Sequence, residues 1–501
     1  MPVRVLAGRA GPFLALLAGL AMALGFAPYG HGWIVPPALA VAFAQVAAAP
    51  RRRAALGAYL FGLGYAGAGV YWIFISISRY GGGPLAASAV TPLMIALFAL
   101  YPLAALMLGR WVGAGRRGVT TLAALPAAWL LVEWVRSWLF TGATWLAVGY
   151  TQVDLPPGAL APVLGLYGVG VLVCAPAGGL AWLALRPDAR RLGVAAALIA
   201  AYLASGALWG VHWSRPAGPA MDVALVQGNV PQDKKWLVDN RVDTLRYYAQ
   251  ASRRHYGTPL IVWPEAAVPA FYDAVAENFL DPLAEEAADA GSHIVTGVPA
   301  RGADGGAYNA VVVLGQGPAT GYFKRHLVPF GEYVPFRGLL GGALDFIGAP
   351  LGDFSAGTEP APLTVDGVTI GASVCYEVTF GPLIADALPQ AQVLLNVSND
   401  GWFGDSAAPH QHLEMARMRA LETGREMLRA TNTGITAVIG ADGTIRAQAP
   451  QFERTVLEAS VRPRRGETPY VVYRDVPAVA LVLAALVLAA GLARAPRRRA
   501  D

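Results

Sequence analysis

Three residues of different chemical types stand where predicted β-strands end, and together they could carry out acyl transfer. Glu265 ends the stretch PLIVWPE, Lys324 lies in GYFKRHLVP, and Cys375 ends GASVC. A cysteine becomes a strong nucleophile when a nearby base accepts its proton, and a carboxylate can be that base. A lysine ammonium can hold the carboxylate and donate to the developing oxyanion, with the backbone N–H of Tyr376 as a second donor. These roles suit acyl transfer through a thioester.

Each of these residues also has a plain structural explanation. A lone cysteine at the end of an apolar strand usually belongs to the packing of the core. Glu265 could be a solvated turn residue, and Lys324 could be a surface charge on an edge strand. The sequence by itself does not show that the three side chains meet, so the hypothesis depends on a fold that brings these strand ends together.

The part of the chain that carries these residues has the pattern of a layered α/β domain. From Met221 onward, short apolar stretches alternate with polar or amphipathic ones, and no internal repeat or Gly-rich phosphate loop is found. An Asp-Gly turn within 436–448 predicts a hairpin. Strands are expected at 222–229, 259–265, 293–299, 308–315, 320–326, 368–377 and 393–400, and helices at 239–255, 273–290, 379–387 and 409–429.

The first 213 residues are almost entirely apolar residues, Gly and Arg. The whole chain of 501 residues is 55% hydrophobic and only 14% charged, whereas soluble chains carry about 25% charged residues. A membrane helix needs about 20 mainly apolar residues, and the sequence predicts eight such spans. They lie near 10–27, 33–49, 54–77, 85–109, 118–140, 160–185, 192–213 and 475–493.

Short Arg clusters, such as residues 51–53, lie in alternate loops between these spans, and Arg79 is the clear exception. Because cytoplasmic loops are enriched in Lys and Arg, both termini are expected in the cytoplasm and the polar domain on the other side of the membrane, as a periplasmic or extracellular domain. The charged start and first apolar run would also fit a signal peptide, but the apolar character continues, so this span is expected to be retained. The expected parts are 1–213 with spans one to seven, 214–474 as a periplasmic catalytic domain, and 475–501 with the eighth span and a basic cytoplasmic tail.

The charge and the cysteines argue against several other classes of protein. The net charge of +5 comes from Arg clusters between apolar runs and forms no basic stripe, so no nucleic acid is expected. Cys174 lies in an apolar run and Cys375 in the polar domain, so neither a disulfide nor a metal site is expected. No diffusible cofactor is expected either.

Two segments allow more than one interpretation. Glu133 and Arg136 lie three residues apart in a predicted span and so on one helix face. They could form an ion pair that locks helices together, or they could shape a lipid headgroup site. The apolar, Gly-rich segment 336–352 could be a buried loop, or a mobile lid that admits lipid tails.

The motifs around the three residues resemble those of the nitrilase superfamily, whose members use a Glu, Lys and Cys triad. The resemblance covers about 221–460 and is specific at WPE, at KRHLVPFGEYVP, and at CYE followed by NVSNDGWFGDS. Together with the membrane spans, QGNVPQDKKW and EWVRSWLFTG make the chain similar to the bacterial apolipoprotein N-acyltransferases. His410 departs from the pattern, since an aromatic residue is expected there.

This resemblance implies a nitrilase-like αββα sandwich joined to a membrane α-helical bundle. It implies Glu265 as the general base, Lys324 as the transition-state stabiliser and Cys375 as the nucleophile. By the same resemblance, Glu332 is implied as catalytic support, and Trp236, Tyr376 and Glu377 as residues for substrate binding or loop support.

The resemblance also implies a ping-pong reaction without a cofactor or a metal. Cys375 attacks the sn-1 ester of a phospholipid, typically phosphatidylethanolamine, and the α-amine of a diacylglyceryl lipoprotein then attacks the thioester. The enzyme is expected to be a monomer among membrane lipids. Two alternatives stay open, namely a membrane-tethered nitrilase-type amidase, which fits the triad equally well, and a non-catalytic transporter or scaffold.

Overall fold

The computed structural model describes residues 3–333 and 353–496, so the segment 336–352, interpreted either as a buried loop or as a mobile lid, lies outside the described residues. The chain divides into two compact units. Unit 1 comprises Met1–Ile73, Ser88–Val211 and Tyr473–Asp501, and unit 2 comprises Phe74–Ala87 and His212–Val472.

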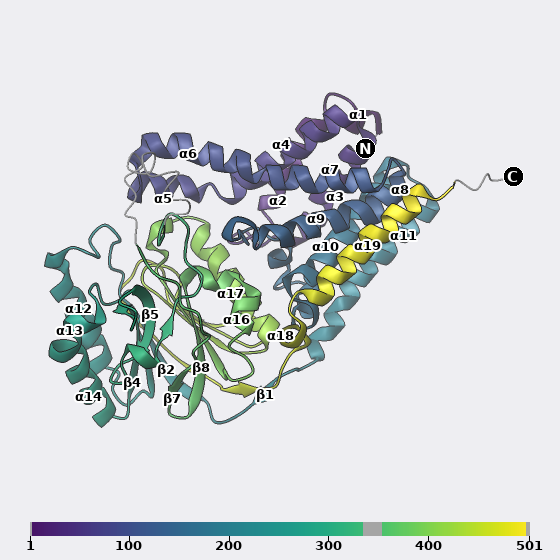
Figure 1. The fold of residues 1–501 in the computed structure, drawn as a ribbon. Helices are drawn as coiled ribbons and strands as arrows, with labels where there is room; N and C mark the ends of the chain where they lie inside the picture. The colour runs from purple at the N-terminus through teal and green to yellow at the C-terminus, as the bar shows by residue number, and fades with distance from the viewer. Residues whose placement is uncertain (1–2, 334–352, 497–501) are drawn as a thin grey trace. The chain divides into compact units, whose positions relative to one another are not determined.

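Unit 1 is built from apolar helices (Figure 1). Within the described residues, five helices are long and apolar enough to cross a membrane, and a sixth candidate is a pair bent by 55°. The pair is α4 (Arg51–Gly69) of unit 1 with α5 (Trp72–Tyr80), most of which belongs to unit 2. The five contain α6 (Gly83–Phe98) with α7 (Leu100–Val112), α8 (Arg117–Val119) with α9 (Leu125–Arg136), α10 (Ala161–Leu185), α11 (Ala189–Ala204) and α19 (Val476–Arg494), while α2 (Gly11–Ala23) and α3 (Val35–Ala48) are shorter apolar helices.

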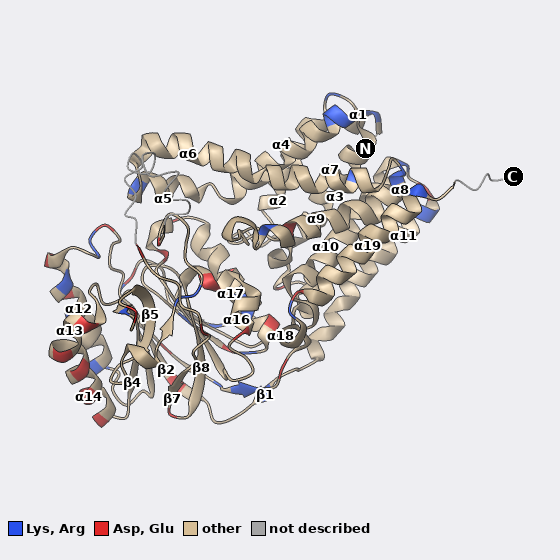
Figure 2. Ribbon diagram, viewed as in Figure 1, with Lys and Arg blue, Asp and Glu red and all other residues tan. Residues whose placement is uncertain are grey.

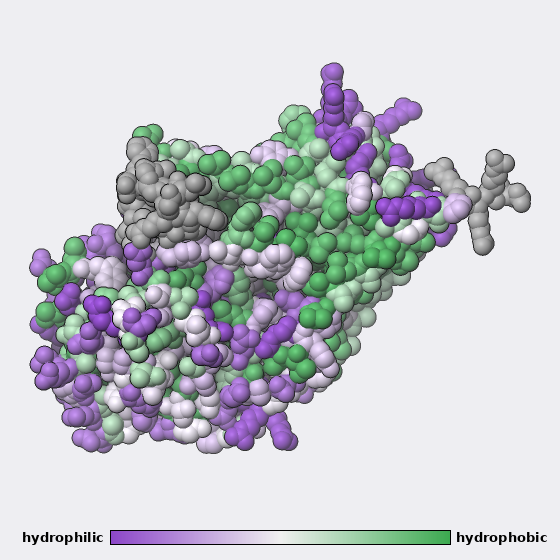
Figure 3. All heavy atoms as spheres, viewed as in Figure 1, coloured by the Kyte–Doolittle hydropathy of each residue, from purple (hydrophilic) through white to green (hydrophobic). Residues whose placement is uncertain are grey.

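Large apolar side chains are exposed on the helices of unit 1. Phe13 is 66% exposed, Trp111 70% and Val487 73%, and Figure 3 shows hydrophobic residues covering much of this helical surface. Water would disfavour so much exposed apolar area, whereas the hydrocarbon of a bilayer accommodates it. The exposed surface therefore indicates a membrane protein.

Glu133 and Arg136 both bind the segment that follows their helix. Glu133 accepts hydrogen bonds from the Trp129 indole N–H at 2.9 Å and from the backbone N–H of Val148 at 3.2 Å. Arg136 donates to the backbone oxygen of Trp145 at 2.7 Å. Buried charges are costly unless they are paired or hydrogen-bonded, so these contacts explain how unit 1 holds both residues at its interior.

Unit 2 contains two six-stranded sheets. In each sheet, three neighbouring strands run parallel, and the strands at the edges are antiparallel. The first sheet has the order β13 (Thr455–Val461), β2 (Met221–Gln227), β3 (Leu260–Val262), β4 (His293–Arg301), β5 (Ala307–Val313) and β6 (Tyr322–Phe323), and the second has the order β12 (Ile445–Gln448), β11 (Ala437–Ile439), β10 (Met427–Thr431), β9 (Val393–Ser398), β8 (Val368–Val374) and β7 (Leu363–Val365).

Three hydrophobic clusters define four layers in unit 2. The central cluster joins Val223 and Leu225 of the first sheet to residues such as Leu395 of the second. The alternate residues of β2, Ala224 and Val226, pack instead against the helices that cover the first sheet, as the two-residue period of a strand requires. The covering helices are α12 (Val238–Arg253) and α14 (Asp281–Asp289) on the first sheet, and α16 (Gly381–Ala385) and α17 (Ala408–Thr423) on the second.

The α/β prediction for this part of the chain is confirmed, with one correction to a helix. The helix expected at 409–429 ends at Thr423, and β10 already begins at Met427. Gly424 terminates the helix with a φ of +61°, a conformation that glycine adopts without steric cost. The predicted helix was too long because the buried residues of β10 continue the apolar character of α17.

Candidate active site

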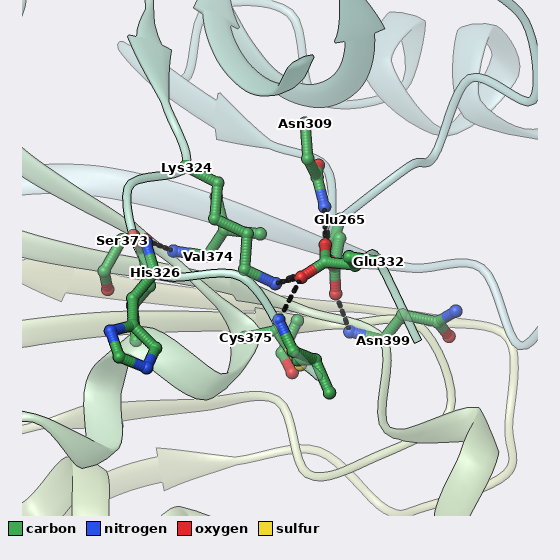
Figure 4. A network of polar contacts seen from close by, with 12 residues as sticks. Glu265, Asn309, Lys324, His326, Glu332, Ser373, Val374, Cys375 and Asn399 are labelled. Carbon is green, nitrogen blue, oxygen red and sulfur yellow. Dashed lines mark hydrogen bonds and ion pairs between the residues drawn. The ribbon is translucent and has the colours of Figure 1, made fainter. Parts of the chain in front are cut away.

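The three residues expected to carry chemistry lie at strand ends in the sandwich of unit 2 (Figure 4). Glu265 lies three residues beyond β3, and Lys324 directly follows β6 in the same sheet. Cys375 directly follows β8 of the second sheet. The site therefore forms where the ends of strands from two facing sheets come together.

The Glu265 carboxylate is held by one donor on each oxygen. The side-chain amide of Asn309 donates to Oε1 at 2.8 Å, and the backbone N–H of Asn399 donates to Oε2 at 2.8 Å. The ammonium of Lys324 lies 3.9 Å from Oε1. Glu265 is only 8% exposed, so these contacts fix the direction of the carboxylate.

Lys324 forms its shortest ion pair with Glu332, at 2.7 Å. Glu332 is itself held by Asn309 at 3.0 Å and by the backbone N–H of Val328 at 2.8 Å. Figure 4 shows Lys324 and Glu332 pointing toward one another. Burial works to lower the pKa of Lys324, but the carboxylates of Glu332 and Glu265 outweigh it and hold that pKa above its usual range. Lys324 is therefore a permanent cation beside Glu265.

The surroundings of Cys375 disfavour ionisation of its thiol. Burial, and then the carboxylate of Glu265, raise the pKa of the Cys375 thiol to about 12, against the opposing effect of Lys324. The thiol is therefore neutral at rest, and attack requires a base at that moment. The backbone of Cys375 has a φ of +50°, which non-glycine residues rarely adopt and which often marks a functional site.

Glu377 connects the segment after β6 to the end of β8. Its Oε1 accepts hydrogen bonds from the Tyr322 hydroxyl at 2.9 Å and from the backbone N–H groups of Arg325 at 2.7 Å and His326 at 3.0 Å. Its Oε2 accepts from the backbone N–H of Val374 at 2.7 Å. Because Lys324 and Cys375 immediately adjoin these groups, Glu377 holds the two sides of the site in register.

The two aromatic residues expected near the site differ in their surroundings. Trp236 is 49% exposed, in the segment before α12. The ring of Tyr376 is partly buried and packs edge-on against Phe380, with their ring centroids 5.0 Å apart. Trp236 is thus available to a ligand, whereas Tyr376 is packed within the turn that follows the nucleophile.

Two further residues of the site were missed from the sequence. Asn309 bridges Glu265 and Glu332, and its signal was a lone amide within the apolar strand YNAVVV. Lys235 is 2% exposed, and its ammonium donates to the backbone oxygen of Glu265 at 2.9 Å. Burial lowers the pKa of Lys235 to about 8, and nothing in the local pattern distinguishes it from its exposed neighbour Lys234.

The described residues contain no group of three or more His, Cys, Asp and Glu side chains that could hold a metal ion. The arrangement instead combines a neutral thiol, an oriented carboxylate and a permanent cation. Such a set can form and break a thioester: the carboxylate moves the proton, and the cation stabilises the negative charge that develops on a carbonyl oxygen.

Two family models and several curated relatives match this chain. The carbon-nitrogen hydrolase family matches residues 222–470, and the N-terminal domain of apolipoprotein N-acyltransferase matches residues 18–180. The apolipoprotein N-acyltransferase of Methylococcus capsulatus is 46% identical, covering 97% of this chain and 96% of the relative. That of Vibrio cholerae is 38% identical and covers 98% of each chain.

Solved structures of the nitrilase superfamily also match. A CN-hydrolase superfamily protein from Xanthomonas campestris is 18% identical, with a TM-score of 0.35, and the match covers 52% of this chain and 97% of that chain. A branch 10 member of the nitrilase superfamily from Saccharomyces cerevisiae is 19% identical, with a TM-score of 0.37, and the match covers 52% of this chain and 94% of that chain.

Proposed function

Because this chain belongs to the apolipoprotein N-acyltransferase family, we propose that it carries out the last step of lipoprotein maturation. It transfers the sn-1 acyl chain of a phospholipid, through a thioester on Cys375, to the α-amine of the N-terminal diacylglyceryl-cysteine of an apolipoprotein. The observation that carries this proposal is a thiol, a carboxylate and a cation gathered at one site, in a chain that also has long apolar helices.

In the first half-reaction, Glu265 accepts the proton of the Cys375 thiol while Sγ attacks the ester carbonyl. The resulting oxyanion is stabilised by the ammonium of Lys324 and by the backbone N–H of Tyr376. When the tetrahedral intermediate collapses, the C–O bond breaks and Glu265 returns the proton to the leaving oxygen. The products are the acyl thioester and a lysophospholipid.

In the second half-reaction, the neutral α-amine of the lipoprotein attacks the thioester carbonyl. Glu265 accepts a proton from the attacking nitrogen, and the same two donors stabilise the second oxyanion. The C–S bond then breaks, and Glu265 returns the proton to the sulfur, so the thiol is regenerated beside a new amide. Water must be kept from the thioester, because hydrolysis would turn the transferase into a lipase. Atoms and charge balance without a metal or a cofactor.

Four residues have supporting roles in this proposal. Glu332 orients Lys324 through their ion pair. Glu377 supports the loop after the nucleophile, and Tyr376 contributes its backbone N–H. Trp236, whose indole is half exposed, binds substrate at the edge of the site.

The proposed setting is a bacterial inner membrane crossed eight times, with the catalytic domain on the periplasmic side. The candidate spans within the described residues, together with the two shorter apolar helices α2 and α3, support this number. Figure 2 shows Lys and Arg near α1 (Val3–Ala7), near α8 and at the C-terminal end of α19, which supports cytoplasmic termini. The proposed parts are residues 1–213, 214–474 and 475–501, and the enzyme acts as a monomer on phosphatidylethanolamine.

Mass spectrometry of the full-length protein, purified from membranes, tests the proposal. An acyl adduct on Cys375 is expected, and it should be lost on treatment with hydroxylamine and be absent from Cys375→Ala. Transfer of the chain to a synthetic diacylglyceryl lipopeptide should follow when the peptide is added. A Cys375→Ala protein that still N-acylates the lipopeptide would refute the proposed nucleophile.

A further inference from the structure

A cluster of polar residues that the proposed mechanism does not use contacts the backbone of the nucleophile. His412 comes from α17, Asp400 from the turn after β9, Arg429 from β10 and Asn396 from β9. All four are 2% exposed or less. Burying this many polar groups is unfavourable unless their hydrogen bonds are made, so their contacts indicate what the cluster holds.

Two members of the cluster reach the backbone oxygen of Cys375. His412 Nε2 lies 3.1 Å from this oxygen, and the side-chain amide nitrogen of Asn396 lies 3.4 Å from it. Asn396 also donates to the hydroxyl of Ser373 at 3.1 Å. The carbonyl of the nucleophile is thus held by two side chains from two different elements.

The other contacts determine which nitrogen of His412 carries the proton. A carbonyl oxygen only accepts, so Nε2 must be protonated to bind Cys375. On the other side of the ring, an Arg429 guanidinium nitrogen lies 3.0 Å from Nδ1 and can only donate to it. Asp400 lies 3.0 Å from Nδ1 and already pairs with Arg429 at 2.8 Å and with the Ser398 hydroxyl at 2.7 Å. The contacts therefore favour a neutral ring with its proton on Nε2.

The electrostatic surroundings agree with a neutral ring. Burial, and then the guanidinium of Arg429, lower the pKa of His412 and outweigh the opposing effect of Asp400. Burial works to raise the pKa of Asp400, but the guanidinium of Arg429 outweighs it and holds that pKa below its usual range. Arg429 thus aligns both side chains, and the cluster keeps its donor aimed at Cys375 across the neutral pH range.

Holding the carbonyl of Cys375 also determines where the next N–H points. The cis peptide bonds of the described chain lie elsewhere, so the bond between Cys375 and Tyr376 is trans and planar. In a trans peptide the carbonyl oxygen and the following N–H point in opposite directions. A carbonyl drawn toward His412 and Asn396 therefore directs the Tyr376 N–H the other way. The φ of +50° at Cys375 shows that this peptide is held in an orientation that the chain alone would not favour.

We propose that His412, assisted by Asn396, is a positioning residue that orients the Cys375–Tyr376 peptide so that the Tyr376 N–H becomes an oxyanion donor. The inference rests on the proposed thioester chemistry, because only a reaction that passes through an oxyanion needs this donor. Lys324 is the other donor, so losing the orientation weakens the stabilisation without abolishing it.

Two substitutions of His412 distinguish the role of Nε2 from that of Nδ1. His412→Gln can place an amide N–H near the position of Nε2, and so keeps the donor to Cys375. His412→Asn keeps a polar group near Nδ1, beside Asp400 and Arg429, but does not reach Cys375. His410→Asn makes the same change two residues earlier in the same helix, outside the cluster, and is the matched control.

The experiment measures two reactions of Cys375 in the full-length protein in phospholipid–detergent micelles. The first is the single-turnover rate of acyl-thioester formation at saturating phospholipid. The second is the rate of alkylation by iodoacetamide, a displacement at carbon that forms no oxyanion. Removing one oxyanion donor typically slows catalysis by about 10²–10³-fold, and a donor that is only misaligned should cost somewhat less.

We expect His412→Asn to slow thioester formation by about 10–100-fold, with alkylation changed by less than about threefold. His412→Gln should restore most of the acylation rate, and His410→Asn should match the wild type in both reactions. The inference is overturned if His412→Asn acylates within about twofold of wild type, or if both reactions fall by the same factor. A wild-type protein that forms no thioester would instead refute the proposed function.

Discussion

Glu332, which is partly buried, and Glu377, which is fully buried, are both carboxylates beside the site, yet the protein holds them in opposite ways. Glu332 pairs with the ammonium of Lys324 at 2.7 Å. Glu377 is held by backbone N–H groups that include those of Arg325 and Val374, both at 2.7 Å. Burial works to raise the pKa of each, but Lys324 outweighs it and lowers the pKa of Glu332, whereas the pKa of Glu377 remains raised.

This difference in partners separates a carboxylate with an electrostatic role, Glu332, from one with a structural role, Glu377. Around Glu332, two carboxylates share one buried cation, so a change of charge at one position alters the others. Around Glu377, the partners are mainly backbone groups, so the carboxylate determines where chain segments lie. The following substitutions test this division.

The largest effect is expected at Cys375, where the two regions meet. Cys375→Ala removes the nucleophile of both half-reactions, so N-acylation of a diacylglyceryl lipopeptide should fall by at least about 10⁴-fold. The melting temperature of the protein should change little, because the residue is small. Residual activity above one-hundredth of wild type would show that another group can form the acyl intermediate.

Lys324→Met, in the region around Glu332, should have the next largest effect on activity. It removes one oxyanion donor, so kcat should fall by about 10²–10³-fold, with a smaller change in KM. It also leaves the partly buried Glu332 without its cation, and stability should therefore fall as well. The double variant Lys324→Met with Glu332→Gln should recover stability but not kcat. Recovery of both would mean that Lys324 is only structural.

Glu377→Gln tests the structural role of Glu377. The amide presents N–H groups where one carboxylate oxygen now accepts from backbone N–H groups, so we expect a loss of about 2–3 kcal/mol in stability, seen as a lower melting temperature. Glu426→Gln is the matched control, because Glu426 accepts a backbone hydrogen bond from Arg462 at an exposed position. It should change stability by less than about 0.5 kcal/mol. Equal effects of the two substitutions would contradict the role of Glu377.

The smallest effect is a difference in pH dependence. The lowered pKa of Glu332 contributes stability above the usual value of 4.5, which is lost as the pH falls through the lower, folded-state pKa. The raised pKa of Glu377 contributes stability that is complete below 4.5 and is lost as the pH rises through the folded-state pKa. From pH 7 to pH 4, the difference in unfolding free energy between wild type and Glu332→Gln should therefore narrow, and the difference between wild type and Glu377→Gln should widen. Melting temperatures across this range measure both, and gaps that move in the same direction would contradict the comparison.

Local pattern predicted most of the elements that carry the site. The strands before Glu265 and Cys375 were recognised from short apolar runs, because burial on both faces leaves few polar residues in them. His412 and Arg429 escaped notice for the opposite reason. Each looks like an ordinary polar residue of an amphipathic stretch, and only the packing of α17 and β10 places both at 1% exposure or less.

The sequence by itself determined the class of the protein, its apolar helices, and the residue types able to form a thioester. These depend on composition and short-range periodicity, which act within a few residues. The tertiary structure decided that Glu265, Lys324 and Cys375 meet and that Glu332 pairs with Lys324. It also decided that His412 and Asn396 bind the carbonyl of Cys375. Apart from the Glu332–Lys324 pair, which is eight residues apart, those contacts join residues tens of positions apart. They exist because two sheets pack face to face around a shared core, which no local pattern encodes.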